Sequence, residues 1–421
     1  MIIVKLQGLY KNRSIINGSL FSIFSFINRG IGFVLLLILA KYIQPKEYGY
    51  LGLFGTVTMV LGYFTAMSTE GYMSVSFFKD GESGLRNTLS SLCLLSVSTT
   101  FVWIVVLLSA GSLVADLLSL PIEILYLAVL VSFFTLYVNV NLDYFRIREK
   151  VKIYGIISCS NAVLNFIVSI VFVNILLLGW GGRVYAQFIC FAIFGMLSIY
   201  YFLRKNYIAL PSINHVKRML LWGVPLIPHQ ITSFFRGGCD TYIVKYFYSI
   251  EDVGLFGFAN TLASVIFMLG IGFNQSNSVD IYKTLGDISI TKEEKLYRLK
   301  KQRMIYWCLY LGFSVIYTFL AFVFVPILLP KYVDSLNYLP FLSLYYFLIC
   351  VYLIYTNYLF FYNKTKNIMY ITFGSALLHL LLSLLLTRYS LYFTCCIYVL
   401  TQLIVAIAIR YEALSCLKLR I

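Results

Sequence analysis

The chain has 421 residues, of which 60% are hydrophobic and only 12% are charged. A soluble protein of this length carries about twice that charged fraction, so the composition excludes an ordinary soluble enzyme or regulator. The net charge is +16, but the basic residues lie beside apolar segments, where anionic lipid headgroups explain them and no nucleic acid is needed.

Twelve apolar segments of about 20 residues or more follow one another along the chain, and each is long enough to cross a bilayer as a helix. The composition therefore predicts an all-α integral membrane protein with about 12 transmembrane helices. We expect these helices at Ile15–Ala40, Tyr48–Thr69, Leu85–Ser109, Pro121–Phe145, Val151–Leu178, Gly182–Leu203, Arg218–Tyr246, Val253–Asn277, Met304–Leu329, Tyr338–Tyr362, Asn367–Thr387 and Leu391–Ile409.

The basic residues indicate the orientation of these helices. Of the 33 Lys and Arg residues, 25 lie in the two tails and the even-numbered loops, and six lie in the odd-numbered loops. Because cytoplasmic loops are enriched in Lys and Arg, both termini are predicted to be cytoplasmic. The longest even-numbered loop, Ser278–Arg303, is highly charged and is predicted to form a short amphipathic or solvated helix on the cytoplasmic surface.

The chain divides near its middle into two similar halves. Residues 1–203 form a predicted N-terminal lobe, residues 204–217 a cytoplasmic linker, and residues 218–421 a C-terminal lobe. A shift of 205 residues aligns several positions of the two halves, among them Gly49 with Gly254. Six helices in each half give a parallel repeat, and transporters built in this way hold their substrate in a central cavity between two lobes that rock by alternating access.

Two arginines lie within predicted helices, Arg29 about halfway along the first and Arg236 well inside the seventh. A charge at the bilayer centre costs about 2.5–3.5 kcal/mol on insertion scales, so such residues point to what the helices surround. The planar fork of arginine suits phosphate oxygens, which predicts a site for a phosphate or diphosphate. Two alternatives stay open: Arg236 pairs with Asp240 four residues later, and Arg29 snorkels or pairs with another helix.

For each of the other polar residues within or near the predicted helices, the sequence allows two roles. Asp240 and Glu70 are predicted to take part in ion coupling or in charge pairing. Asn274 and Gln275, near the inner end of the eighth helix, either hydrogen-bond sugar hydroxyls or are helix-end residues near water. His379 stands alone in the eleventh helix and is either a polar contact or a proton carrier.

The seventh helix carries two prolines, Pro225 and Pro228, near its cytoplasmic end. Each removes a backbone donor, so the helix is predicted to kink there, as a hinge or as a fixed bend. The nine cysteines form no metal-ligand pattern and no phosphate-binding loop is present, so we expect no metal and no cofactor.

At several places the sequence resembles Wzx-type polysaccharide flippases of the multidrug/oligosaccharidyl-lipid/polysaccharide (MOP) superfamily. The runs that carry the resemblance are Gly223–His229, Asp240–Phe247, Val253–Asn260, Asn28–Phe33 and Ala40–Gly49.

This resemblance implies a flippase, not an enzyme, in the bacterial cytoplasmic (inner) membrane. Its substrate would be an undecaprenyl diphosphate-linked oligosaccharide, turned to the periplasmic face for O-antigen or other surface polysaccharide. A polysaccharide polymerase and a chain-length regulator would be partners. The driving force is left open by the sequence, with coupling to H⁺ or Na⁺ as one alternative. Lys41 and Lys245, at the outer ends of the first and seventh helices, would assist the two arginines or be simply interfacial.

Three other functions compete. A multidrug or cation antiporter of the same superfamily should present acidic residues to its substrate, but Asp240 has an arginine neighbour. An integral-membrane polysaccharide polymerase should have a long outer loop and clustered carboxylates, which the sequence lacks. A flippase for a different lipid-linked substrate differs only in the headgroup.

Overall fold

The computed structural model describes residues 13–287, 289–362 and 364–420, and helices make up most of them. The first half contains α2 (Arg13–Tyr42), α3 (Pro45–Thr65), α4 (Tyr72–Leu118), α5 (Ile122–Ile147), α6 (Val151–Ile170) with the π-helical turn η1 (Val171–Ile175), and α7 (Gly179–Arg204). The second half contains α8 (Ile213–Gly223), η2 (Val224–Leu226), α9 (Ile227–Ser233), η3 (Phe234–Gly238), α10 (Cys239–Phe247), α11 (Ile250–Gly286), α12 (Lys292–Leu328), η4 (Pro330–Asn337), α13 (Leu339–Phe361), α14 (Thr365–Leu386) and α15 (Leu391–Arg420).

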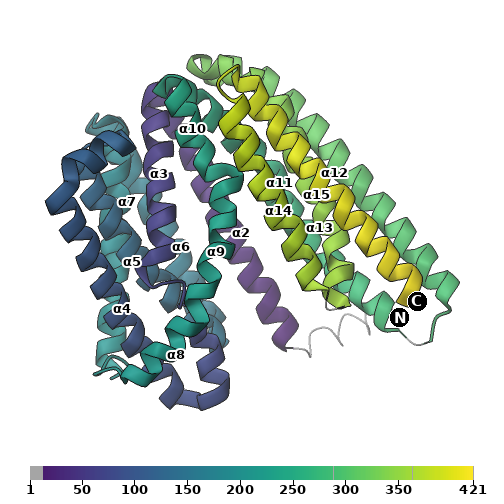
Figure 1. Ribbon diagram of the computed structural model, residues 1–421, viewed down its shortest axis with the longest axis horizontal. Coiled ribbons are helices and arrows are strands. Elements are labelled where there is room, and N and C mark those ends of the chain that lie inside the picture. The colour runs from purple at the N-terminus through teal and green to yellow at the C-terminus, as the bar shows by residue number, and fades with distance from the viewer. Residues whose placement is uncertain (1–12, 288, 363, 421) are drawn as a thin grey trace. The chain divides into compact units, whose positions relative to one another are not determined.

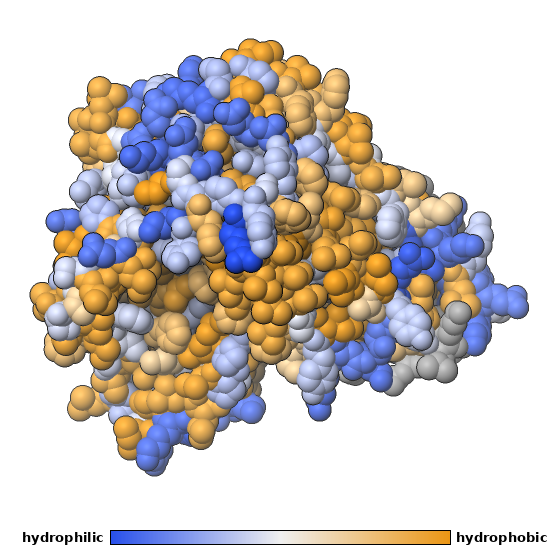
Figure 2. Space-filling model, turned by 45° about the horizontal axis from the view of Figure 1, so that its top comes forward, coloured by the Kyte–Doolittle hydropathy of each residue, from blue (hydrophilic) through white to orange (hydrophobic). Residues whose placement is uncertain are grey.

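Every one of the twelve predicted segments falls on helix, so the all-α membrane fold is confirmed. Within the described ranges, ten helices are long and apolar enough to span a membrane; α3 and the broken series Ile213–Phe247 are not among them. On the face in Figure 2, hydrophobic residues cover broad continuous areas and hydrophilic residues gather in separate patches, as is typical of a surface in contact with lipid. The number of crossings and the side of the termini stay predictions.

Contacts divide the chain into two units: unit 1 is Met1–Ile43 with Tyr50–Ile231, and unit 2 is Gln44–Gly49 with Thr232–Ile421. Residues 204–217 were predicted to link two lobes, and here α8 packs against α4 within unit 1. The fully buried ring of His215 on α8 explains that packing, because its Nε2 atom lies 3.0 Å from the hydroxyl of Thr88 on α4. The lobe boundaries themselves stay a prediction.

Unit 1 is built around α5, which packs against α4 and α7, while α2 packs on α6. Polar contacts fix the spacing of these helices. The Asn141 amide donates to Ser198 on α7 over 2.9 Å, and the Ser132 hydroxyl donates to the carbonyl of Thr58 on α3 over 3.2 Å. Hydrogen bonds of this kind hold helices together in lipid, where apolar surface alone does not drive their association.

Unit 2 is built around α13, which packs against both α11 and α15, and Figure 1 shows α11 to α15 running side by side. The core between them is apolar and closed, with Ile354, Val405 and Ile409 each fully buried. The start of α11 is fixed by a capping box, in which Ser249 and Asp252 each bond the other's backbone N–H.

The predicted seventh helix is broken into five pieces. Pro225 lies in the 3₁₀ turn η2, where it cannot donate a hydrogen bond, and Gly237 and Gly238 end the π-helical turn η3. The irregularity expected near Pro225 and Pro228 is therefore present. Their role as a hinge stays a prediction.

The charged stretch Ser278–Arg303 is organised differently from what the sequence suggested. Instead of a short separate helix, α11 runs on to Gly286 and α12 begins at Lys292. The reason is local, because Thr291 caps α12 by accepting a hydrogen bond from the Glu294 backbone N–H, and the acidic first turn favours a helix start.

Two helix starts meet in unit 2 without side chains between them. A Cβ atom added to Gly49 would lie 2.1 Å from the Ile250 carbonyl oxygen, and one added to Gly254 would lie 1.7 Å from the Pro45 carbonyl oxygen. Both glycines and both carbonyls are pairs related by the 205-residue shift. The same contact is thus made twice with the roles exchanged, as a local two-fold relation between residues 45–49 and 250–254 requires, and only glycine fits there.

Candidate functional site

Arg236 lies in the π-helical turn η3 of unit 2, between α9 and α10. Its Nη2 atom donates a hydrogen bond of 2.8 Å to the amide oxygen of Gln402 on α15. Gln402 is buried and neutral, so it orients the guanidinium without cancelling its charge. Arg236 as a whole is half-buried.

Arg29 lies in α2 of unit 1 and is exposed. Its neighbour Asn28 donates to the Ser158 hydroxyl on α6 over 3.1 Å, which anchors this turn of α2. No acidic side chain in the described part of the chain lies within ion-pair distance of Arg29. Arg29 and Arg236 belong to separate units, and their meeting in one cavity stays a prediction.

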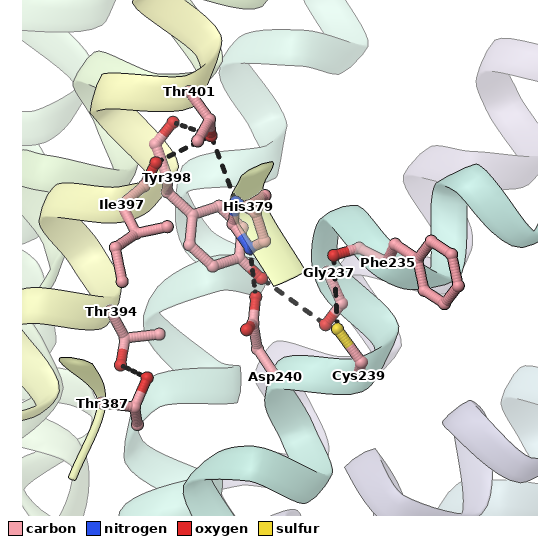
Figure 3. A network of polar contacts seen from close by, with 10 residues as sticks. All are labelled: Phe235, Gly237, Cys239, Asp240, His379, Thr387, Thr394, Ile397, Tyr398 and Thr401. Atoms are coloured by element: carbon pink, nitrogen blue, oxygen red, sulfur yellow. Dashed lines mark hydrogen bonds and ion pairs between the residues drawn. The ribbon is translucent and has the colours of Figure 1, made fainter. Parts of the chain in front are cut away.

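A closed polar network surrounds Asp240 in unit 2 (Figure 3). The side chain of Asp240 is fully buried, and its Oδ2 atom lies 2.7 Å from Nε2 of His379 on α14. Nδ1 of His379 lies 3.1 Å from the Thr401 hydroxyl on α15. The Tyr398 ring stands edge-on to the imidazole, 4.8 Å between centroids, and its hydroxyl donates to the Gly237 carbonyl.

This network answers whether Arg236 pairs with Asp240, which the four-residue spacing between them had left open. Asp240 pairs with His379 and not with Arg236, although Arg236 is four residues away on the same segment. The reason is the π-helical turn, which changes the register between the two residues and directs them to different neighbours.

Asp240 keeps one oxygen without a partner, since Oδ1 is buried and receives no hydrogen bond from any residue that the structure describes. A buried carboxylate oxygen that lacks a donor costs free energy, and binding a proton or a cation there removes that cost. The position therefore suits an ion-coupling group, as the sequence suggested for Asp240.

A second polar feature is a cavity of about 290 Å³ inside unit 1, between α3, α5 and α7. Its polar lining comes from Thr58, Glu70, Ser132, Thr135, Asn139 and Gln187. Glu70 lies in the turn between α3 and α4, and burial raises the pKa of its carboxyl above the ordinary range. Its Oε2 atom is buried and has no hydrogen-bond partner among the described residues.

The remaining predicted residues are placed as follows. Asn274 on α11 accepts a hydrogen bond of 2.8 Å from the Asn357 amide on α13, so at least part of its capacity serves packing. The side chain of Gln275 lies outside the described residues. Lys41 is an exposed residue in the last turn of α2, and Lys245 is half-buried in the last turn of α10.

The sequence did not predict the hydrogen-bond partners of Arg236 and Asp240. Gln402 lies 166 positions from Arg236, and His379 lies 139 positions from Asp240. Asn139 and Gln187 gave only a weak signal, namely an amide inside an apolar helix.

The chain matches a family model described as "Polysaccharide biosynthesis protein" over residues 15–278, and a model described as "MatE" over residues 225–385. It is 24% identical over 352 residues to the "Lsg locus putative protein 1" of Haemophilus influenzae (strain ATCC 51907 / DSM 11121 / KW20 / Rd), covering 80% of this chain and 82% of that protein.

Solved structures share the fold. An inward-facing multidrug resistance MATE family transporter of the MOP superfamily superimposes with a TM-score of 0.71 at 15% identity, covering 92% of this chain and 95% of that one. An outward-facing structure of such a transporter gives a TM-score of 0.61 at 16% identity over 96% of each chain.

Proposed function

Since the chain belongs to the polysaccharide biosynthesis protein family, we propose that it is a flippase for an undecaprenyl diphosphate-linked oligosaccharide. The chain is a multi-pass bacterial membrane protein of the MOP superfamily, a transporter and not an enzyme. The cargo would be assembled on the cytoplasmic face and turned to the periplasmic face, where a polymerase and a chain-length regulator would act on it.

The observation that carries this proposal is the environment of Arg236. A guanidinium in a membrane-embedded segment keeps its charge at any physiological pH, and here its hydrogen-bond partner is the neutral Gln402. A diphosphate is an anion with several oxygens, so it would satisfy the remaining N–H groups in the bidentate geometry that arginine favours. Arg29 would supply a second fork for the same group.

Ion coupling is the second part of the proposal. Asp240, with one unpartnered oxygen beside His379, would take up and release H⁺ or Na⁺ during the cycle. Glu70 in unit 1 is the other carboxyl available for this role. Pro225 and Pro228 would let the broken seventh segment change its bend as the lobes rock.

The lysines and the polar residues of α11 would have supporting roles. Lys41 and Lys245 would attract the anionic headgroup toward the outer ends of α2 and α10. Asn274 and Gln275 would contact sugar hydroxyls as the oligosaccharide passes.

The test is transport by the purified full-length protein in proteoliposomes that contain fluorescent undecaprenyl diphosphate-linked oligosaccharide. We expect the outer-leaflet fraction of this lipid to change only in vesicles with protein, and faster with an imposed H⁺ or Na⁺ gradient. Arg236→Lys is the charge-conserving control and should retain part of the rate that Arg236→Ala loses. A rate in protein vesicles equal to that in empty vesicles would refute the flippase assignment.

A cation antiporter is the second candidate, because the MATE transporters share the fold and two carboxyls lie in the helical units, the buried Asp240 and the half-buried Glu70. The same vesicles separate the two functions. An antiporter would take up an organic cation against a gradient and leave the lipid-linked oligosaccharide in place.

A further inference from the structure

The cavity inside unit 1 has no role in the mechanism described so far. We propose that it is a subsite for one uncharged pyranose residue of the translocated glycan. This inference rests on the proposed function, because it names the part of the cargo that contacts unit 1.

The size of the cavity separates a sugar from an ion. Its volume of about 290 Å³ is many times what a single water molecule or a small ion requires. A bound Na⁺ or proton needs a tight cluster of oxygens and less space than one water molecule. A sugar ring with its hydroxyl groups is an occupant of the right scale, near the lower limit for small-molecule sites.

Three lining side chains have hydrogen-bonding capacity that the protein does not use. Thr135 and Asn139 on α5 and Gln187 on α7 form no side-chain hydrogen bond with any residue that the structure describes; Asn139 is exposed, and Thr135 and Gln187 are half-buried. A side-chain amide donates and accepts, and so does a hydroxyl. The pair of amides facing one space therefore matches a ligand that is rich in hydroxyl groups.

Two further side chains are held in fixed orientations. The Thr58 hydroxyl donates to carbonyls of its own helix at 2.9 and 3.1 Å, and the Ser132 hydroxyl donates to the Ala128 carbonyl at 2.9 Å. Their protons are thus engaged, and the oxygen lone pairs remain available as acceptors. The cavity offers donors from the amides and acceptors from these hydroxyls, on rigid helices.

The rest of the wall is apolar and comes from Met59, Val131, Leu136 and Phe191. A pyranose has apolar C–H faces and polar edges, so it suits a wall of this mixed character. An acyl chain would leave the amides without partners, at a cost in free energy. A phosphate would find no cation, because Glu70 is the only charged residue of the lining.

Glu70 also predicts which sugars are excluded. Burial raises the pKa of this carboxyl, and neither its charged nor its neutral form attracts an anion. An acidic sugar such as a uronic acid should therefore bind more weakly than its neutral counterpart.

The experiment is saturation-transfer-difference NMR on the full-length protein in phosphatidylcholine nanodiscs. The probes are a methyl glucopyranoside, a methyl N-acetylglucosaminide and a methyl galacturonide, none of which carries a lipid. We expect saturable binding of the two neutral probes, on the order of 1 mM, and weaker binding of the acidic one. Asn139→Ala and Gln187→Ala should each weaken binding by about tenfold, the loss of one hydrogen bond.

A matched pair of variants controls for folding and for general effects. Thr58→Val removes a cavity hydroxyl, whereas Thr372→Val removes a hydroxyl on α14 that likewise bonds only its own helix, at 2.8 and 3.2 Å. The first should weaken sugar binding and the second should not. Sugar-free undecaprenyl diphosphate should bind Asn139→Ala and wild-type protein equally.

The outcomes are distinct. No saturable binding of any of the three probes, or equal binding by the cavity variants, would overturn the subsite. Loss of the sugar signal on adding NaCl alone would assign the cavity to a cation instead. Because the probes carry no lipid, sugar binding stands even if no transport is found, and transport without sugar binding removes only this inference.

Discussion

Asp240 and His379 should be energetically coupled, and replacing either one should lower the free energy of unfolding by a measurable amount. The two side chains are 0% and 2% exposed, and the atoms in contact are 2.7 Å apart. Removing one partner of a buried pair strands the other without its hydrogen bond, which costs about 1–3 kcal/mol. We therefore expect Asp240→Ala and His379→Ala each to destabilise unit 2 by about that amount.

The double variant should cost much less than the sum of the two single changes, because no stranded group remains once both partners are gone. A coupling energy of about 1–3 kcal/mol is expected, the upper part of the range for contacting residues. The assay is unfolding of the detergent-solubilised protein by SDS, followed by near-UV circular dichroism. Additive costs in the three variants would refute the coupling.

A neutral contact in the same unit serves as the matched control. The hydroxyls of Thr394 and Thr387 are buried and 3.0 Å apart. Thr394→Val removes one hydrogen bond with little change of shape and should cost only about 1 kcal/mol.

Transport tests the same residue in another way. If the Asp240 carboxyl is the ion carrier, Asp240→Asn should make the transport rate in the proteoliposomes independent of an imposed ion gradient.

Three further predictions concern separate parts of the chain. Arg29→Ala or Arg236→Ala should abolish surface polysaccharide in cells that depend on this protein, at unchanged membrane levels by immunoblot, and Lys should restore part of it; normal polysaccharide in both Ala variants would contradict an anion site. Because burial raises the pKa of Glu70, stability should fall as the pH rises above the ordinary value of 4.5; Glu70→Gln should melt higher than wild type at pH 7.5, with a gap that closes toward pH 4.5, and a constant gap would contradict the cause. Gly254→Ala must move its Cβ by more than 1 Å from the carbonyl it faces, so it should lose about 1–3 kcal/mol of stability in SDS titrations; Gly257→Ala, whose Cβ would find its nearest neighbour at 3.9 Å, is the control and should lose less.

The helical fold could be predicted because its signals are local. Runs of about 20 apolar residues located all twelve predicted helices. Pro225 and Pro228 indicated where the seventh predicted helix is irregular. Ends were less certain, as α4 shows. It begins at Tyr72, before the predicted start at Leu85, but it is kinked at Gly81, whose φ of 65° and ψ of −144° are not helical. The predicted start lies just after this kink.

The candidate site could be predicted only in part, because its contacts join residues far apart in the chain. The sequence marked Arg236 and Asp240 as unusual, since charged residues are rare inside apolar helices. It did not show that Arg236 bonds Gln402 or that Asp240 bonds His379. Nor did it show the π-helical turn that makes the side chains of Arg236 and Asp240 point to different neighbours. Spacing of four residues favours a pair only in a regular α-helix.

The crossing of Gly49 and Gly254 has a mechanical consequence. Backbone touches backbone there, so no rotamer change can loosen the contact by degrees. Residues 44–49 pack in unit 2, while the chain on either side of them belongs to unit 1. Residues 44–49 can therefore separate from the start of α11 only if the backbone itself moves, because no side chain lies between them.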